Sequence, residues 1–223
     1  EDEPDELAAD LFNETIYANS RWGHSILGTA QSVSSLSGEH LRRYLSTHYT
    51  PQNVLVSAVG DVHHDKVVKL AEKLLGDLSP NEQAVHAEPP IPRVRSRRRQ
   101  FERDAEQVHL CCGTRAYSAE DPRRFAAWLL DSILTGGYSS RLFQEVREKR
   151  GLCYNIGPMS VSYRKTGFWA VETSVAPQQA RRVTDLIGRE LRKVKTKGVG
   201  KAELKRAQEM SRINLLLSEE SSS

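Results

Sequence analysis

The chain has 223 residues, of which 38% are hydrophobic and 27% are charged, and its formal net charge is +3. This length suits one large domain or two small ones, and the composition is that of an ordinary globular protein. No run of apolar residues approaches the roughly 18 that a membrane-spanning helix needs, and the charge is too small to indicate a nucleic-acid-binding protein.

The cysteines and the beginning of the chain bear on its location in the cell. The chain opens on an acidic stretch and not on a basic and apolar signal sequence. Its cysteines are Cys111, Cys112 and Cys153; they form no CxxC spacing and lie in apolar, strand-like runs. Buried free thiols in a reducing compartment are the expected state. We therefore expect a cytoplasmic protein.

Residues 1–76 show three helical patterns and one strand pattern. Apolar residues recur at helical spacing in residues 7–19, from Ser37 to just before Pro51, and from Val67 to the glycine at 76. Between the last two, the segment Asn53–Val59 alternates around β-branched residues, which predicts a strand.

Residues 77–96 are the best candidate for a linker, since they contain four prolines and lack an apolar period. A basic run overlaps the end of this segment, formed by Arg93, Arg95, Arg97, Arg98 and Arg99. We interpret it as a solvated linker and edge strand, because basic residues on edges discourage sheet-to-sheet pairing. The alternative is a phosphate-binding arm, but no interleaved aromatic residues or nucleic-acid motif accompany the run.

The rest of the chain alternates strands and helices. The expected order is a strand at 108–113, a helix from Asp121, a short capped helix at 139–150, a hairpin of 152–162 with 167–175, a helix from Ala176 to about 194, and a last helix at 202–217. Residues 53–76 and 168–194 both show a strand, a polar turn and an amphipathic helix. This internal similarity suggests two related halves.

The sequence contains no complete catalytic motif. Its histidines are His24, His40, His48, His63, His64, His86 and His109, and none forms an HxxH, HxxEH or HExxH motif. We interpret them as surface or capping residues. No dinucleotide-binding fingerprint, phosphate-binding loop or serine nucleophile elbow is present either.

Two residues of the segment 136–154, GGYSSRLFQEVREKRGLCY, remain as candidates. Arg147 lies at the edge of the apolar face of the short helix, and Tyr154 lies just beyond the turn that ends it. Considered by themselves, the arginine is best interpreted as a solvated residue of a basic last turn, and the tyrosine as a strand residue with a packed ring.

The segment SSRLFQEVREKRGLCY closely resembles the signature of the second half of pitrilysin/insulinase-type zinc peptidases, and above all of the bacterial relatives of mitochondrial processing peptidase. Other parts resemble the same proteins in unbroken order: EDEPDELAADLF, HYTPQNVLVSAVGDV, EQVHLCCGTRAYSAEDPRRFAAWLL and KGVGKAELKRAQ. The resemblance covers nearly the whole chain.

This resemblance implies an α/β (α+β) fold of two homologous halves, each an antiparallel sheet covered by helices, that close like a clamshell. Residues 1–78 would then be the remainder of a catalytic N-terminal half, 79–96 a linker, and 97–223 most of a substrate-binding C-terminal half. Both halves are expected to be incomplete in this chain.

The resemblance also implies a zinc-dependent metalloendopeptidase that processes or degrades peptides. In that family an HxxEH helix and a further glutamate bind zinc, and an arginine and a tyrosine seven residues apart bind substrate. These two match Arg147, which would hold the substrate backbone, and Tyr154, which would donate a hydrogen bond to the scissile carbonyl or its oxyanion.

HxxEH is absent here, so we assign no metal ligand and expect this chain alone to bind no catalytic zinc and to be inactive. The alternative is a metal-free, non-catalytic partner subunit of a heterodimeric peptidase of the same family. The partners implied are a peptide or unfolded polypeptide and a second family member in a homodimer or heterodimer, without nucleic acid or membrane.

Overall fold

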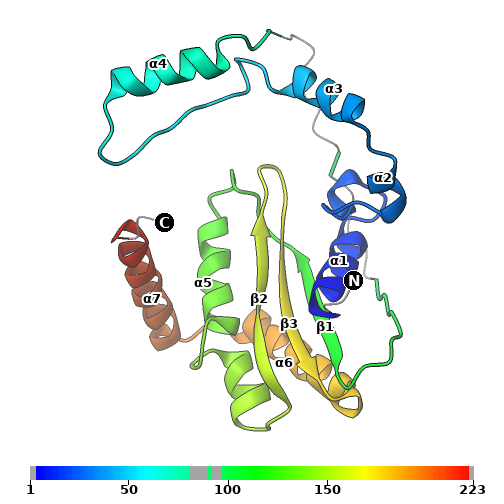
Figure 1. The fold of residues 1–223 in the computed structure, drawn as a ribbon. Coiled ribbons are helices and arrows are strands. Elements are labelled where there is room, and N and C mark those ends of the chain that lie inside the picture. Colours follow the sequence, from blue (N-terminus) through cyan, green and yellow to red (C-terminus); the bar gives the residue numbers. More distant parts are fainter. Residues whose placement is uncertain (1–3, 81–89, 92–96, 221–223) are drawn as a thin grey trace. The chain divides into compact units, whose positions relative to one another are not determined.

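The computed structural model describes residues 4–80, 90–91 and 97–220. It divides into two compact units, Glu1–Ser25 with Pro90–Ser223 and Ile26–Pro89 (Figure 1). Residues up to Ser25 thus pack with the later part of the chain, whereas the predicted boundaries assign them to the first half. The predicted boundaries separate two homologous halves, which are not the same as the two compact units, so the boundaries stay a prediction.

In its described residues, the larger unit is built on a three-stranded antiparallel sheet. Its strands are β1 (Val108–Arg115), β2 (Cys153–Ser162) and β3 (Gly167–Val175), in the spatial order β1-β3-β2. Strands β2 and β3 form the predicted hairpin, in which Ser162 pairs with Gly167. The predicted fold class, antiparallel sheet covered by helices, is confirmed in this unit.

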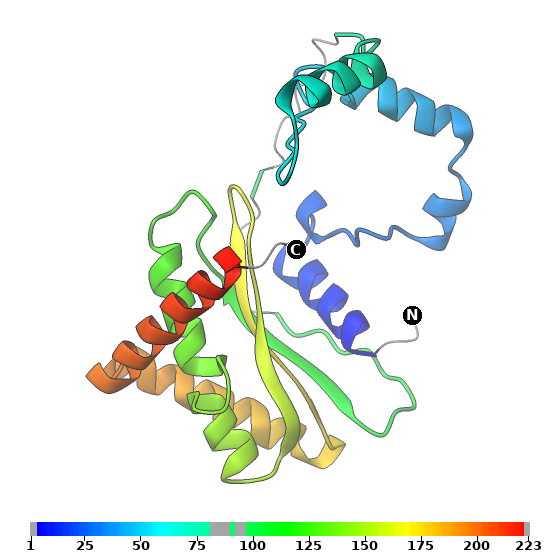
Figure 2. The same ribbon diagram turned by 60° about the vertical axis from the view of Figure 1, so that its left-hand side comes forward.

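One face of the sheet carries the main core. Helices α5 (Arg124–Thr135), η3 (Phe143–Glu148) and α6 (Ala180–Lys197) belong to this side of the unit (Figures 1 and 2). Val171 and Val175 of β3 are buried there against apolar residues of η3 and α6. The 310-helix η4 (Pro177–Gln179) joins β3 to α6.

The opposite face of the sheet carries a smaller, aromatic core. Helix α1 (Pro4–Ile16) and the 310-helix η1 (Arg21–Gly23) bring Tyr17, which is fully buried, to Phe168 and Ala170 of β3. The rings of Phe12 and Phe168 meet edge to face with centroids 5.3 Å apart. Because side chains of a strand alternate between its faces, β3 serves both cores.

Helix α7 (Lys201–Glu220) is joined to the unit by an ion pair as well as by packing. The Nε and Nη2 atoms of Arg141 donate hydrogen bonds to Oε1 and Oε2 of Glu203, each at 2.7 Å. Ala207 is buried on the same helix. The pKa of Glu203 is lowered to about 2, chiefly by the hydrogen bonds from Arg141.

The smaller unit consists of three helices in its described residues: α2 (Ala30–Ser34), α3 (Gly38–His48) and α4 (His64–Leu75). The last two confirm predicted helices. Ser37 caps α3, since its side chain accepts a hydrogen bond from the backbone N–H of His40, whose imidazole accepts one from the N–H of Ser37.

The strand predicted at Asn53–Val59 is wrong: these residues form no strand, and Leu55 and Val59 are 91% and 95% exposed. A strand is stabilised by hydrogen bonds to a neighbouring strand, and the described part of this unit offers none. Of the two similar segments, only 168–194 therefore forms its strand.

The basic run and the linker lie partly outside the described residues. Arg93 and Arg95 are among those not described, as is most of 77–96. Arg97–Arg99 are exposed and belong to no strand, so the edge-strand interpretation is wrong for them, and Arg99 pairs with Glu14. In the ranges that are described, no helix is both long and apolar enough to cross a bilayer.

The Arg141–Glu203 ion pair predicts how stability depends on pH. Because the pKa of Glu203 is lowered from 4.5 to about 2 on folding, the pair stabilises the folded state above about pH 5. This contribution is lost as the pH falls toward 2. The free energy of unfolding, measured with urea, should differ most between the native chain and Glu203→Gln near pH 6. The difference should become progressively smaller at lower pH.

Glu209→Gln is the matched control on the same helix, since Glu209 is 3.9 Å from Lys205 and well exposed. It should change the free energy of unfolding little at any pH. A difference between Glu203→Gln and the native chain that is the same at pH 6 and pH 3 would contradict the role of the ion pair.

Candidate functional site

The predicted helix at 139–150 forms, but its central part is a π-helix, Phe143–Glu148. The N–H of Lys149 donates to the carbonyl of Gln144, 3.0 Å away and five residues back, in place of the four of an α-helix. Leu142, Phe143 and Val146 are buried in the main core. Single π-helical turns are frequent at functional sites.

Gly151 ends this helix in the left-handed conformation that the sequence predicts, with φ at +58°. Its N–H donates to the carbonyl of Arg147 at 2.8 Å, and the N–H of Leu152 donates to that of Val146 at 3.0 Å. Leu152 is buried, so the chain leaves the turn with a fixed direction into β2. Tyr154 is the second residue of that strand.

The structure brings the two predicted site residues together. The guanidinium of Arg147 lies 5.0 Å from the ring centroid of Tyr154 and 4.8 Å from that of Phe143. Such cation–π contacts orient an arginine without consuming its hydrogen-bond donors. The interpretation of Arg147 as merely a solvated residue is therefore incomplete.

The neighbouring basic residues are neutralised and Arg147 is not. Lys149 and Arg150 both pair with Glu145, and these contacts lower the pKa of that carboxyl. In the described part of the chain the guanidinium of Arg147 forms no ion pair. It is thus the cation of this turn that remains available for a ligand.

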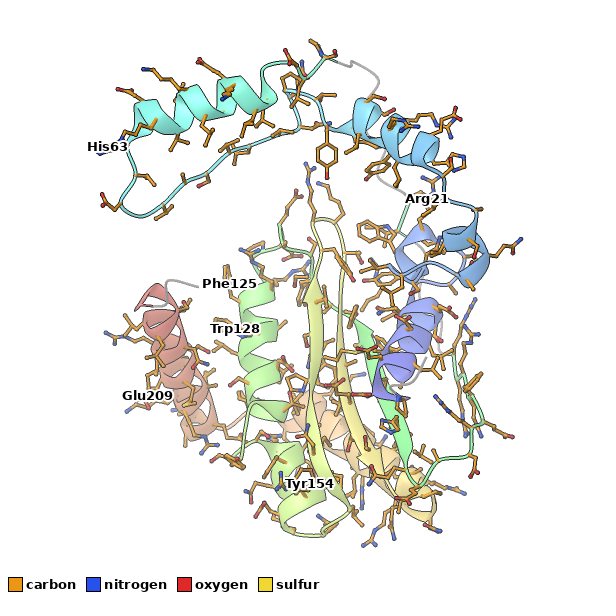
Figure 3. All side chains as sticks on the ribbon, in the orientation of Figure 1. Arg21, His63, Phe125, Trp128, Tyr154 and Glu209 are labelled. Carbon is orange, nitrogen blue, oxygen red and sulfur yellow. The ribbon has the colours of Figure 1, made fainter. Side chains whose placement is uncertain are left out.

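Tyr154 is 83% exposed, so its hydroxyl is open to a ligand (Figure 3). It lies at an irregularity of the β2–β3 pairing, between Cys153 and Ile156. Strand β2 is at the edge of the described sheet, which leaves one row of its backbone groups outside strand pairing. The pair formed by Arg147 and Tyr154 and the open edge of β2 are therefore adjacent along the chain.

The residues that this structure describes do not fit a zinc site. No group of three or more histidine, cysteine, aspartate or glutamate side chains converges among them. His40 takes part in the cap of α3, as expected of a capping residue, and His109 lies 3.1 Å from the hydroxyl of Ser174. His86 lies outside the described residues.

The three cysteines are free, as predicted, but only half-buried. Burial raises the pKa of Cys111 to about 12, and it also raises those of Cys112 and Cys153. Thiols with raised pKa values are poor nucleophiles at neutral pH. A cysteine-based reaction is therefore disfavoured.

Sequence reasoning missed two surfaces of the larger unit. One is an apolar hollow of about 340 Å³ beside Phe125 and Trp128 of α5 (Figure 3), with Trp169 donating to the carboxylate of Asp131 at 2.5 Å. The other is an arginine-lined hollow on α6. Large aromatic residues and arginines at exposed helical positions were the available signals.

The family model described as the peptidase M16 inactive domain matches residues 35–211. The chain belongs to this family. The match covers most of the chain and includes both Arg147 and Tyr154. It confirms the resemblance found in the sequence.

Relatives and solved structures agree with the family. An uncharacterized zinc protease of Bacillus subtilis is 32% identical over 221 residues, which are 99% of this chain and 53% of that protein. One of Streptomyces coelicolor is 34% identical over 93% of this chain and 46% of its own length. The chain thus spans about half the length of these relatives.

The fold is shared with two more distant proteins of known structure. A peptidase M16 inactive domain from Pseudomonas fluorescens has a TM-score of 0.77 at 22% identity and covers 94% of this chain and 51% of its own. A chain of complex III2 from Candida albicans has a TM-score of 0.81 at 19% identity, covering 96% and 52%. At these identities the similarity establishes the fold alone.

The turn that places Tyr154 can be tested by adding one methyl group. The methyl group added by Gly151→Ala meets no atom within 4 Å, but the alanine has to adopt the φ of +58° that glycine has here. It should therefore cost about 1–2 kcal/mol in the free energy of unfolding through backbone strain alone. Urea unfolding measures this loss.

Gly157→Ala on β2 is the control, because its added methyl also meets nothing within 4 Å and its φ is not left-handed. It should change the free energy of unfolding by less than about 0.5 kcal/mol. Equal effects of the two changes would show that the conformation at Gly151 is not the constraint.

Proposed function

We propose that this chain is the substrate-holding part of a zinc-dependent metalloendopeptidase that processes or degrades peptides. The observation that carries the proposal is the contact between Arg147 and Tyr154 beside the edge strand β2. The names of the relatives as zinc proteases support a peptidase over a metal-free subunit without enzymatic function.

In this proposal an extended peptide lies along the edge of the sheet and pairs with backbone groups, a mode that depends little on side chains. Arg147, held by its contacts with two rings, donates hydrogen bonds to backbone carbonyls of the peptide. Tyr154 donates its hydroxyl proton in a hydrogen bond to the scissile carbonyl. That bond strengthens as negative charge develops on the carbonyl oxygen.

No group of three or more potential metal ligands converges among the described residues, so no step through zinc is assigned to them. We place the zinc ligands in the part of the protein that corresponds to the remaining half of the longer relatives. A processing-peptidase-like activity, a homodimer or a heterodimer with a paralogue, and a cytoplasmic location complete the proposal. The free cysteines support a reducing compartment.

The isolated 223-residue chain should contain no stoichiometric zinc and should not cleave peptides, because the ligand set is missing. Elemental analysis after purification and a fluorogenic peptide assay with and without chelator measure both properties. One zinc per chain with chelator-sensitive cleavage would contradict the assignment of the metal to another segment.

In the full-length polypeptide, Tyr154→Phe should lower kcat more than it raises KM, since the lost hydrogen bond acts mainly in the transition state. A loss of about 10²–10³ in kcat is expected for one oxyanion donor. Steady-state kinetics on a single peptide substrate measure the two constants.

Tyr138→Phe is the matched control, because Tyr138 is also exposed, at 77%, and its ring packs against Phe143, which Arg147 contacts as well. It should leave both constants unchanged. A kcat that is unaffected by Tyr154→Phe would remove the hydroxyl from catalysis, whereas a rise in KM alone would restrict it to binding.

A further inference from the structure

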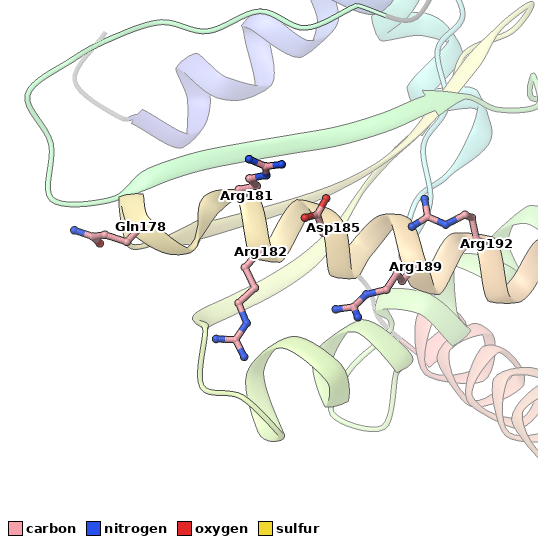
Figure 4. Close-up of a pocket in the computed structure, with 6 residues that line it drawn as sticks. All are labelled: Gln178, Arg181, Arg182, Asp185, Arg189 and Arg192. Carbon is pink, nitrogen blue, oxygen red and sulfur yellow. The ribbon is translucent and has the colours of Figure 1, made fainter.

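The exposed face of α6 carries arginines that the rest of the unit does not explain. A hollow on this helix is lined by Gln178, Arg181, Arg182, Asp185, Arg189 and Arg192 (Figure 4). The opposite face of α6 buries Val183, Leu186 and Ile187 in the main core. Since its apolar face is occupied, α6 cannot insert into a bilayer or a hydrophobic groove, and only its charged face is open to a partner.

These four arginines differ from others of the same unit. Arg123, Arg141, Arg150 and Arg164 pair with acidic residues of their surroundings. Within the described ranges, no ion pair or hydrogen bond joins the side chains of the α6 arginines to an acidic group. Glu190 of the same helix is buried and pairs with Lys193 instead.

Two of the arginines also occupy unfavourable positions. Arg181 and Arg182 lie in the first turn of α6, which contains no acidic residue. Cations in the first turn of a helix are disfavoured by the helix dipole, and they repel one another. Residues that break a local rule without a compensating contact are expected where a surface serves binding.

The charges alternate along the hollow. Arg181 and Arg182 lie at one end, Asp185 in the middle, and Arg189 and Arg192 at the other end (Figure 4). Nine residues of helix separate the centres of the two arginine pairs, which is about 13 Å at the α-helical rise. A ligand that matches this surface carries two anionic groups about 13 Å apart and a cation between them.

We propose that this face of α6 binds an extended polypeptide segment of the pattern acidic-x-basic-x-acidic. In an extended chain, side chains two residues apart point to the same side, and four residues span about 13 Å. The two carboxylates then lie at the two ends of the hollow, where an arginine binds each of them as a planar fork, and the basic residue meets Asp185.

Asp185 decides between a polypeptide and a nucleic acid. A nucleic-acid strand presents a phosphate at every nucleotide, so a phosphate would fall against Asp185 and be repelled. A polypeptide can place a lysine or an arginine there. This inference stands apart from the proposed peptidase function, because it uses neither Arg147 nor Tyr154.

The test uses the intact 223-residue chain and three blocked, fluorescently labelled peptides, GEAKAEG, GEAEAEG and GKAEAKG. Fluorescence anisotropy at low salt should show the tightest binding for GEAKAEG and the weakest for GKAEAKG, and added salt should weaken binding. Arg182→Gln with Arg189→Gln should weaken GEAKAEG binding about fivefold, as expected for two exposed ion pairs.

The matched control is Lys195→Gln with Lys197→Gln, two exposed cations in the last turn of the same helix that do not line the hollow. It should change binding little. Asp185→Asn should abolish the preference of GEAKAEG over GEAEAEG. All these positions are exposed, so circular dichroism should remain unchanged.

Three outcomes would overturn the proposal. They are equal losses of affinity in the double arginine variant and the double lysine variant, a preference for GEAEAEG over GEAKAEG in the native chain, and a preference for GEAKAEG that persists in Asp185→Asn. The first would reduce the surface to general basicity, the second would favour a polyanion, and the third would remove Asp185 from recognition.

Discussion

The burial of β3 on both of its faces is the constraint on which the larger unit depends. Val171 and Val175 point into the core made with η3 and α6, and Phe168 and Ala170 point into the core made with α1. Both neighbours of β3 are strands, so its backbone groups are paired on both sides. Its side chains therefore hold η3 and α6 on one face of the sheet and α1 on the other.

The candidate site is a consequence of this packing. Leu142, Val146 and Leu152 are held in the main core, and between them the chain forms a π-helical turn and a left-handed glycine. Arg147 and Tyr154 are thereby left outside the core and next to each other. Tyr154 is exposed and Arg147 is half-buried over the ring of Phe143, so the core holds the pair in place while both polar groups stay outside it.

Charge is distributed unevenly over the same unit. Around the turn, Lys149 and Arg150 are neutralised by Glu145, and Arg141 is neutralised by Glu203 of α7. The cations without acidic partners in the described structure include Arg147 at the turn and the four arginines of α6. Two separate surfaces therefore have free positive charge, and the ligands that we propose for them differ with their surroundings: a peptide backbone beside an edge strand, and carboxylates on a helix face.

Local features were determined by the sequence by itself. The hairpin of β2 and β3, the helix ends at Ser37 and Gly151, and the spacing of Arg147 and Tyr154 all follow from residues close together along the chain. Interactions between distant residues were decided only by the tertiary structure. Asn53–Val59 has the pattern of a strand but no neighbouring strand to pair with in the described part of its unit, and the helix predicted at 139–150 contains a π-helical segment that buries Phe143 and Val146. Whether an arginine is paired or free likewise depends on acidic residues that can be distant along the chain, as Glu203 is from Arg141. Charge pairing acts through space and not along the sequence.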